Sequence, residues 1–104
     1  MKVSVTQSIN CAHKLPGTEL HGHTYRITAI YFGEPDDSGM VIPIQALDDR
    51  LAFVLIGLNH LQLEDVIGSP ATAERLALYV RRQMGFASCQ IRVQIGDDGY
   101  VETE

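Results

Sequence analysis

The sequence predicts an α+β fold: a four-stranded antiparallel sheet that carries two consecutive helices on one face. Three observations predict it. Apolar and polar residues alternate with a period of two near both ends of the chain, and apolar residues recur with a helical period in the middle. The run GDDG near the C terminus separates two strand-like segments, which is typical of a hairpin. Paired strands with helices inserted between them favour one sheet with a helical layer.

Four segments have the pattern of strands. Residues 2–9 alternate, and the pattern can continue to His13. Residues 20–33 are rich in β-branched and aromatic side chains and lead into the turn-like run EPDDSG. Residues 91–95 alternate again, and a short strand resumes at Tyr100. The predicted order is therefore strand, strand, helix, helix, strand, strand.

Two segments have the pattern of helices. Residues 43–58 begin at a proline, which suits the first turn of a helix. Residues 71–84 have Ser69 or Thr72 as a cap and Gly85 as a stop. The apolar positions of the first helix are Ile44, Leu47, Leu51, Val54, Leu55 and Leu58, and the predicted buried stripe of the second is Leu76, Tyr79, Val80 and Met84.

Length and composition indicate an ordinary globular protein. The 104 residues suffice for one domain, residues 1–104, with 45% apolar and 20% charged residues. We expect no membrane anchor, because no apolar run is long enough, and no nucleic-acid partner, because the formal net charge is −5. The N terminus lacks the apolar core of a secretory signal, so we expect a cytoplasmic protein whose two cysteines, Cys11 and Cys89, are reduced and buried.

Three of the four histidines, His13, His21 and His23, lie within eleven residues. Side chains two residues apart on a strand share a face, so His21 and His23 form an imidazole pair to which His13 can add a third. Three histidines without a partnering cysteine are typical of a catalytic zinc site. The alternative is a set of unrelated polar residues at strand ends. For His60, in the run LNHLQLED, the pattern leaves a functional and a purely structural role open.

The segments CAHKL, LHGHTYRI, GMVI, LNHLQLED and TAERLALYV occur in a characteristic order and spacing. Over residues 9–95 they resemble the 6-pyruvoyltetrahydropterin synthase and 6-carboxytetrahydropterin synthase family. The resemblance implies the tunnelling fold, in which subunits form trimers and face-to-face hexamers around a central β-barrel, with active sites at subunit interfaces. It also implies that His13, His21 and His23 hold Zn²⁺, which binds side-chain oxygens of a dihydropterin and acidifies the carbons bearing them.

The chain departs from this family at its proton-transfer groups. Family members use a cysteine as base four residues before HGH, where this chain has Gly17. Glu19 is the carboxylate nearby, and it is either a general base or a solvated loop residue. Cys11 is another candidate base, for which packing is the better interpretation. The Asp-His dyad of the family corresponds here to Asn59 and His60, and asparagine cannot stabilise an imidazolium by charge.

The resemblance also implies substrate-binding residues. A family glutamate that grips the pterin ring corresponds to Ile95, and Glu102 in the run VET is a weak substitute. Thr72 corresponds to a threonine that family members place beside the pterin, and it also suits the cap of the second helix.

Three functions follow from these residues. The first is a zinc-dependent carbon–oxygen lyase of the 6-pyruvoyltetrahydropterin synthase type with a non-standard active site and altered or reduced catalysis. It acts on or binds a pterin such as 7,8-dihydroneopterin triphosphate and uses Glu19 and His60. The second is a catalytically inactive homologue that binds a pterin or a purine-like ligand. The third is a zinc hydrolase for another small molecule, with a metal-bound hydroxide as nucleophile. The resemblance implies a homohexamer, a dimer of trimers.

Overall fold

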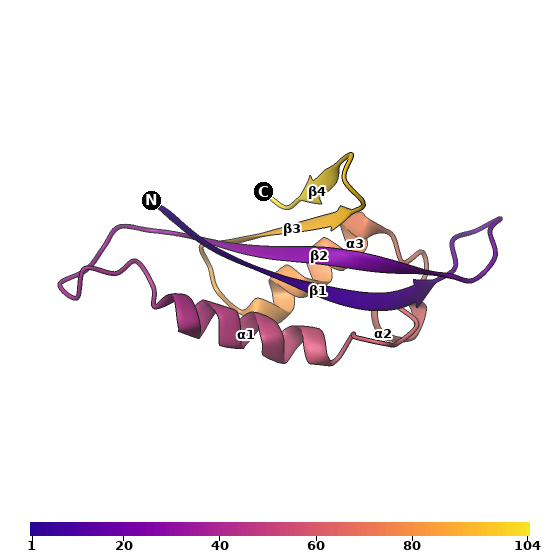
Figure 1. Ribbon diagram of the computed structural model, residues 1–104, viewed down its shortest axis with the longest axis horizontal. Coiled ribbons are helices and arrows are strands. Elements are labelled where there is room, and N and C mark those ends of the chain that lie inside the picture. The colour runs from indigo at the N-terminus through magenta and orange to yellow at the C-terminus, as the bar shows by residue number, and fades with distance from the viewer.

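The computed structural model describes residues 1–104 and contains one antiparallel sheet with the strand order β1-β2-β3-β4 (Figure 1). The strands are β1 (Lys2–His13), β2 (His21–Phe32), β3 (Cys89–Ile95) and β4 (Tyr100–Glu102). All four predicted strands are present, and the first continues to His13, the longer of its two predicted ends. The predicted α+β fold class is confirmed.

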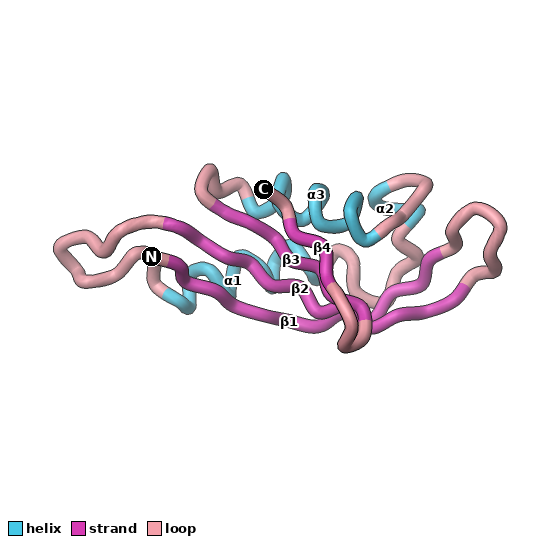
Figure 2. The backbone as a smooth tube through the Cα atoms, turned by 90° about the horizontal axis from the view of Figure 1, so that it is seen from above, coloured by secondary structure: helices cyan, strands magenta, loops and turns pink.

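The helices lie between β2 and β3 in the chain and along one side of the sheet (Figure 2). They are α1 (Ile44–Ile56), α2 (Glu64–Ile67) and α3 (Ala73–Met84). α1 packs against β1 and β2, and α3 packs against β3 and β4. α2 was not predicted, because four residues are too few to show a helical period. None of the helices has the length and apolar character that crossing a membrane requires.

One hydrophobic cluster of 19 buried residues fills the space between the helices and the sheet. It contains alternate residues of the strands, such as Ile27, Ala29 and Ile91, and both predicted helix stripes contribute. Ile44, an apolar position of α1, does not join the cluster: its side chain is 64% exposed because it lies at the first turn of α1, next to an exposed loop. Tyr79 is only partly buried, although it packs against the cluster.

The molecule is elongated, with principal extents of 52 × 25 × 21 Å. The long β1–β2 pair continues past the helices and ends in the 14–20 connection, at the right of Figure 1. Cys11 and Cys89 are buried and free, as predicted. The predicted histidine ligands lie where the β1–β2 pair leaves the helical layer.

Candidate metal centre

The register of β1 and β2 brings three histidines together. His13 lies directly opposite His21, and Cys11 lies opposite His23. Residues paired in this way share a face of the sheet, so all four side chains project to the helical side. The structure thus gathers the three residues that the HGH pattern singled out.

The three imidazole rings form a compact triangle. The ring centroids are 4.4 Å apart for His13 and His21, 4.8 Å for His13 and His23, and 4.7 Å for His21 and His23. One nitrogen from each ring lies within 4.8 Å of the others. His13 is only 4% exposed, whereas His21 is exposed. The cluster is therefore closed toward the core and open toward the hairpin tip.

Backbone carbonyls determine which nitrogen carries the proton in two of the rings. Nδ1 of His13 is 3.1 Å from the carbonyl oxygen of Ala71, and Nδ1 of His21 is 2.8 Å from the carbonyl oxygen of Glu19. A carbonyl oxygen can only accept, so each Nδ1 is the donating, protonated nitrogen. Each Nε2 keeps its lone pair, the form in which an imidazole binds a metal.

The Nε2 atoms of His13 and His21 are 2.8 Å apart. Two lone pairs at this separation repel each other unless a cation or a proton lies between them. Neighbouring nitrogens around a tetrahedral zinc are about 3.3 Å apart, given Zn–N bonds of about 2.0–2.1 Å. That spacing falls between the 2.8 Å contact and the 4.8 Å limit of the cluster. The donor set therefore fits a divalent metal with one position open for a ligand.

The third imidazole, His23, is held in its neutral form. Burial lowers its pKa below 6.5, and the nearby His13 and His21 lower it further. Protons and metal ions compete for the same nitrogen, so a lowered pKa keeps His23 available to a metal at more acidic pH.

Tyr25 forms the inner wall of the cluster, and no sequence signal identified it because it reads as an ordinary core aromatic. Its hydroxyl is 3.3 Å from Nδ1 of His13, and its ring packs edge-on against His13 and His23. Burial raises the pKa of Tyr25 to about 12, with smaller contributions from Cys11 and Glu64. The phenol therefore stays protonated at neutral pH.

The loop that joins the two strands carrying the histidines is a tight turn. Pro16 and Gly17 are its central residues, the Thr18 backbone N–H donates to the Leu15 carbonyl at 3.0 Å, and Thr18 Oγ1 accepts from the Leu15 N–H at 3.1 Å. Gly17 has φ +80°, which glycine adopts readily and other residues rarely. The resemblance puts the family cysteine at this position, and this backbone disfavours any side chain there.

The two other candidate bases differ in their surroundings. Glu19 is exposed, and its carbonyl rather than its carboxylate contacts His21. Cys11 is buried, and its thiol donates to the Leu58 carbonyl at 3.2 Å. Burial raises the pKa of the Cys11 thiol, so little thiolate is present at neutral pH. These surroundings fit the packing role predicted for Cys11.

His60 is exposed and has a left-handed backbone, with φ 65°, which is uncommon for a residue other than glycine. Its backbone N–H donates to the Asn10 carbonyl at 2.7 Å, and Asn59 Oδ1 accepts from the Asn10 N–H at 2.9 Å. The Asn59 side chain therefore fastens this loop to β1. His60 and His23 line the same surface hollow, of about 440 Å³.

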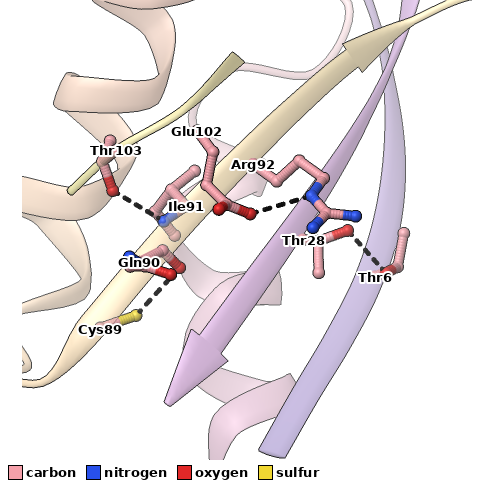
Figure 3. A network of polar contacts seen from close by, with 8 residues as sticks. All are labelled: Thr6, Thr28, Cys89, Gln90, Ile91, Arg92, Glu102 and Thr103. Atoms are coloured by element: carbon pink, nitrogen blue, oxygen red, sulfur yellow. Dashed lines mark hydrogen bonds and ion pairs between the residues drawn. The ribbon is translucent and has the colours of Figure 1, made fainter. Parts of the chain in front are cut away.

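The predicted substrate-binding residues lie elsewhere and have structural partners. Thr72 caps α3, where its hydroxyl oxygen accepts from the Arg75 N–H at 3.2 Å. Glu102 Oε1 accepts from Arg92 Nε at 3.0 Å across β3 and β4 (Figure 3). Neither residue lines the hollow beside His23. Within one chain, the structure does not bring Thr72 and Glu102 into that hollow.

Comparison with known sequences gives one family. The family model described as 6-pyruvoyl tetrahydropterin synthase matches residues 2–94, which is most of the chain. No curated protein sequence gives a match.

Solved structures with this fold include three of 6-pyruvoyl tetrahydropterin synthases. The Caenorhabditis elegans protein has a TM-score of 0.87 at 17% identity, over 100% of this chain and 94% of that chain. The Plasmodium falciparum protein has a TM-score of 0.78 at 22% identity, over 99% and 97%. A Plasmodium vivax variant, described as a catalytic-residue mutant in which a glutamate is replaced by alanine, has 0.80 at 17%, over 99% and 96%. At these identities the likeness shows the fold.

Proposed function

Because this chain belongs to the 6-pyruvoyl tetrahydropterin synthase family, we propose that it is a zinc-dependent lyase that acts on a pterin such as 7,8-dihydroneopterin triphosphate. Family membership supports a pterin-related, synthase-like function. The observation that carries the metal part of the proposal is the convergence of His13, His21 and His23, with the Nε2 atoms of His13 and His21 2.8 Å apart.

The three histidines hold the metal in this proposal. A bound zinc ion would supply Lewis acidity, which polarises side-chain oxygens of the pterin and acidifies the adjacent carbons. The protein's own contribution is orientation, because the carbonyls of Ala71 and Glu19 hold the rings of His13 and His21 with Nε2 free.

Glu19 and His60 are the proposed proton-transfer groups. His60 presents an exposed imidazole at the hollow that His23 also lines, so it is available to a substrate carbon or oxygen there. Glu19 lies at the open side of the cluster, two residues before His21. A catalytic glutamate in the Plasmodium vivax protein, stated in the description of its mutant, supports a carboxylate in this role. Gly17, at the position of the family cysteine, has no side chain that could transfer a proton.

Thr72 and Glu102 are the proposed contacts to the pterin ring. They do not line the hollow beside His23 in one chain, so the proposal includes an assembly in which neighbouring subunits complete the site. We propose a homohexamer built as a dimer of trimers. Its expected signature is a single hexameric species in sedimentation or in scattering at micromolar concentration.

The test combines metal analysis with turnover. Zinc-loaded protein is incubated with 7,8-dihydroneopterin triphosphate, and triphosphate release and the pterin product are followed by chromatography. We expect Glu19→Gln and His60→Gln each to lower kcat by about 10²- to 10⁴-fold, as the loss of a general acid or base does. Glu34→Gln is the matched control, because it makes the same change at an exposed glutamate in the loop after β2, at the opposite end of that strand from His21. It should keep wild-type activity. Zinc-loaded protein that leaves the substrate intact would contradict the proposal.

A second candidate function is pterin or purine binding without turnover. Two observations favour it: the turn at Gly17 disfavours a cysteine base, and the Asn59 side chain is committed to Asn10. The same experiment separates the two functions. Saturable binding of pterins in a thermal-shift series, with no product from the triphosphate, would support the binding protein.

A further inference from the structure

Glu64, the first residue of α2, holds the end of β1 beside the histidine cluster. The Ala12 N–H donates to the Leu61 carbonyl at 3.0 Å, and the Leu63 N–H donates to the Ala12 carbonyl at 2.8 Å. The chain then turns into α2, and Glu64 Oε1 accepts from the Lys14 N–H where the next main-chain carbonyl would otherwise pair. One carboxylate oxygen therefore fixes the backbone directly after the first predicted ligand.

The other carboxylate oxygen of Glu64 has no partner. The residue is partly buried as a whole, but Oε2 is cut off from solvent and accepts no hydrogen bond. The structure contains two ion pairs, the N terminus with Glu34 and Arg92 with Glu102, and neither involves Glu64. A buried carboxylate oxygen without a partner is costly unless a positive charge lies nearby.

The contact with Lys14 does not require a charge, because a neutral carbonyl oxygen would accept the same hydrogen bond. Burial opposes ionisation of Glu64, but the hydrogen bonds to its carboxylate, from the Lys14 N–H first, and the nearby His13 hold its pKa below the ordinary value. The carboxylate is therefore ionised at neutral pH. It also lies close enough to Tyr25 to raise the pKa of that phenol. The charge is thus held against the backbone of Lys14, the residue that follows His13.

We propose that Glu64 is the charge partner of the metal held by His13, His21 and His23. It is a positioning residue and not a ligand, because the group of possible ligand atoms contains the three histidines alone. Three neutral imidazoles leave the charge of a divalent ion uncompensated, and an ionised carboxylate just outside the ligands balances it. The inference rests on the metal site of the proposed function, but it does not depend on the reaction.

The test uses Glu64→Gln, which keeps a carbonyl oxygen for Lys14 and removes the charge. Asp65→Asn is the matched control, because it removes an exposed charge from the next residue. We expect E64Q to weaken Zn²⁺ binding by about 10- to 100-fold, the usual effect of losing an outer-shell partner, and D65N to bind as wild type does. Cobalt-substituted E64Q should keep the wild-type visible spectrum, because the ligands do not change.

The rise in melting temperature on zinc binding distinguishes a charge partner of the metal from a residue that only holds the backbone. Without metal, E64Q should melt at or below the wild-type temperature, because the lowered pKa of Glu64 means that its charge stabilises the folded state. With saturating zinc, it should gain less in melting temperature than wild type does. Equal zinc affinity in E64Q and wild type, an equal gain in melting temperature with zinc, or an E64Q protein that is unfolded without metal would overturn the inference. Wild-type protein that binds zinc but converts no pterin would contradict the proposed function and leave this inference standing.

Discussion

At the β1–β2 hairpin, main-chain groups orient the side chains of the candidate metal ligands, whereas at α3 and β4 the side chains proposed to contact the pterin are themselves structural contacts. The carbonyls of Ala71 and Glu19 orient His13 and His21 through Nδ1 and leave Nε2 free. The Thr72 hydroxyl caps α3, and the carboxylate of Glu102 pairs across the sheet. The three candidate metal ligands are thus brought together within one chain, while the two proposed pterin contacts are engaged in holding the fold.

The largest expected effect is the loss of zinc binding when one histidine of the triangle is removed, compared with the removal of His60. His21→Ala leaves two imidazoles, and we expect zinc affinity to fall by more than about 100-fold, because a catalytic zinc needs three protein ligands. His60→Ala, which removes the imidazole that lines the hollow beside His23, should leave zinc content unchanged. Metal analysis after dialysis against a weak chelator gives both values. Equal zinc content in H21A and wild type would show that the histidine triangle is not the metal site.

As the pH falls, the protein should lose the stability contributed by His23 before it loses the stability contributed by its carboxylates. The folded pKa of His23 is lowered, so the unfolded chain binds this proton more readily. The stability that His23 contributes is present above pH 6.5, the ordinary pKa, and is lost as the pH falls through the lower folded value. The lowered pKa of Glu64 has the same sign, but its loss begins only below about pH 4.5.

Urea unfolding of metal-free protein between pH 4 and 8 tests this order. We expect wild type to lose stability from about pH 6.5 downward, and His23→Gln to lack that first step. Parallel pH profiles of wild type and H23Q would show that His23 does not set the acid limit.

Thr72→Ala tests one of the two proposed pterin contacts. Loss of the helix cap should cost about 1 kcal/mol of unfolding free energy, and Thr72→Ser, which keeps the hydroxyl, should cost much less. If Thr72 also contacts the pterin, the alanine variant raises KM beyond what its lower stability explains, and the serine variant restores it. Chemical denaturation and steady-state kinetics on the same preparations provide the comparison. A KM that follows only the loss of stability would leave Thr72 as a cap alone.

Gly17→Cys has the smallest expected effect. A side chain at φ +80° costs roughly 1 kcal/mol, although a Cβ there would meet no atom within 4 Å. We expect Gly17→Ala to lose the same stability, zinc affinity to stay unchanged in both variants, and the new thiol to give no gain in turnover. A large gain in kcat for G17C but not for G17A would show that the turn adapts and that the cysteine position is still functional.

Local patterns were sufficient to predict the strands and the histidine triangle. Alternation predicted β1 and β2, and once they pair, the two-residue spacing of His21 and His23 determines that they share a face with His13. The non-local contacts had no sequence signal. Glu64 reaches Lys14 only because residues 61–63 lie along β1, and the pairing of a short loop with a distant strand leaves no period in the sequence.

The role of asparagine at position 59 shows the same limit. The resemblance to an Asp-His dyad suggested that Asn59 is the partner of His60. The Asn59 side chain instead accepts a hydrogen bond from the N–H of Asn10, 49 residues away. His60, with its left-handed backbone, is likewise attached to β1 through its own N–H, a contact that the sequence pattern did not indicate. Residue identity indicated which groups are capable of chemistry, whereas distant packing determined which of their atoms are free.

The carbonyl of Glu19 that orients His21 is present whatever side chain position 19 carries. The side chain at position 19 can therefore be exchanged without removing the carbonyl that orients His21 in the candidate metal centre. A collection of variants at this single position would offer the same bound ion a series of different neighbours, acidic, basic, polar or apolar. Such a hairpin is a natural starting point for directing one metal site toward several reactions.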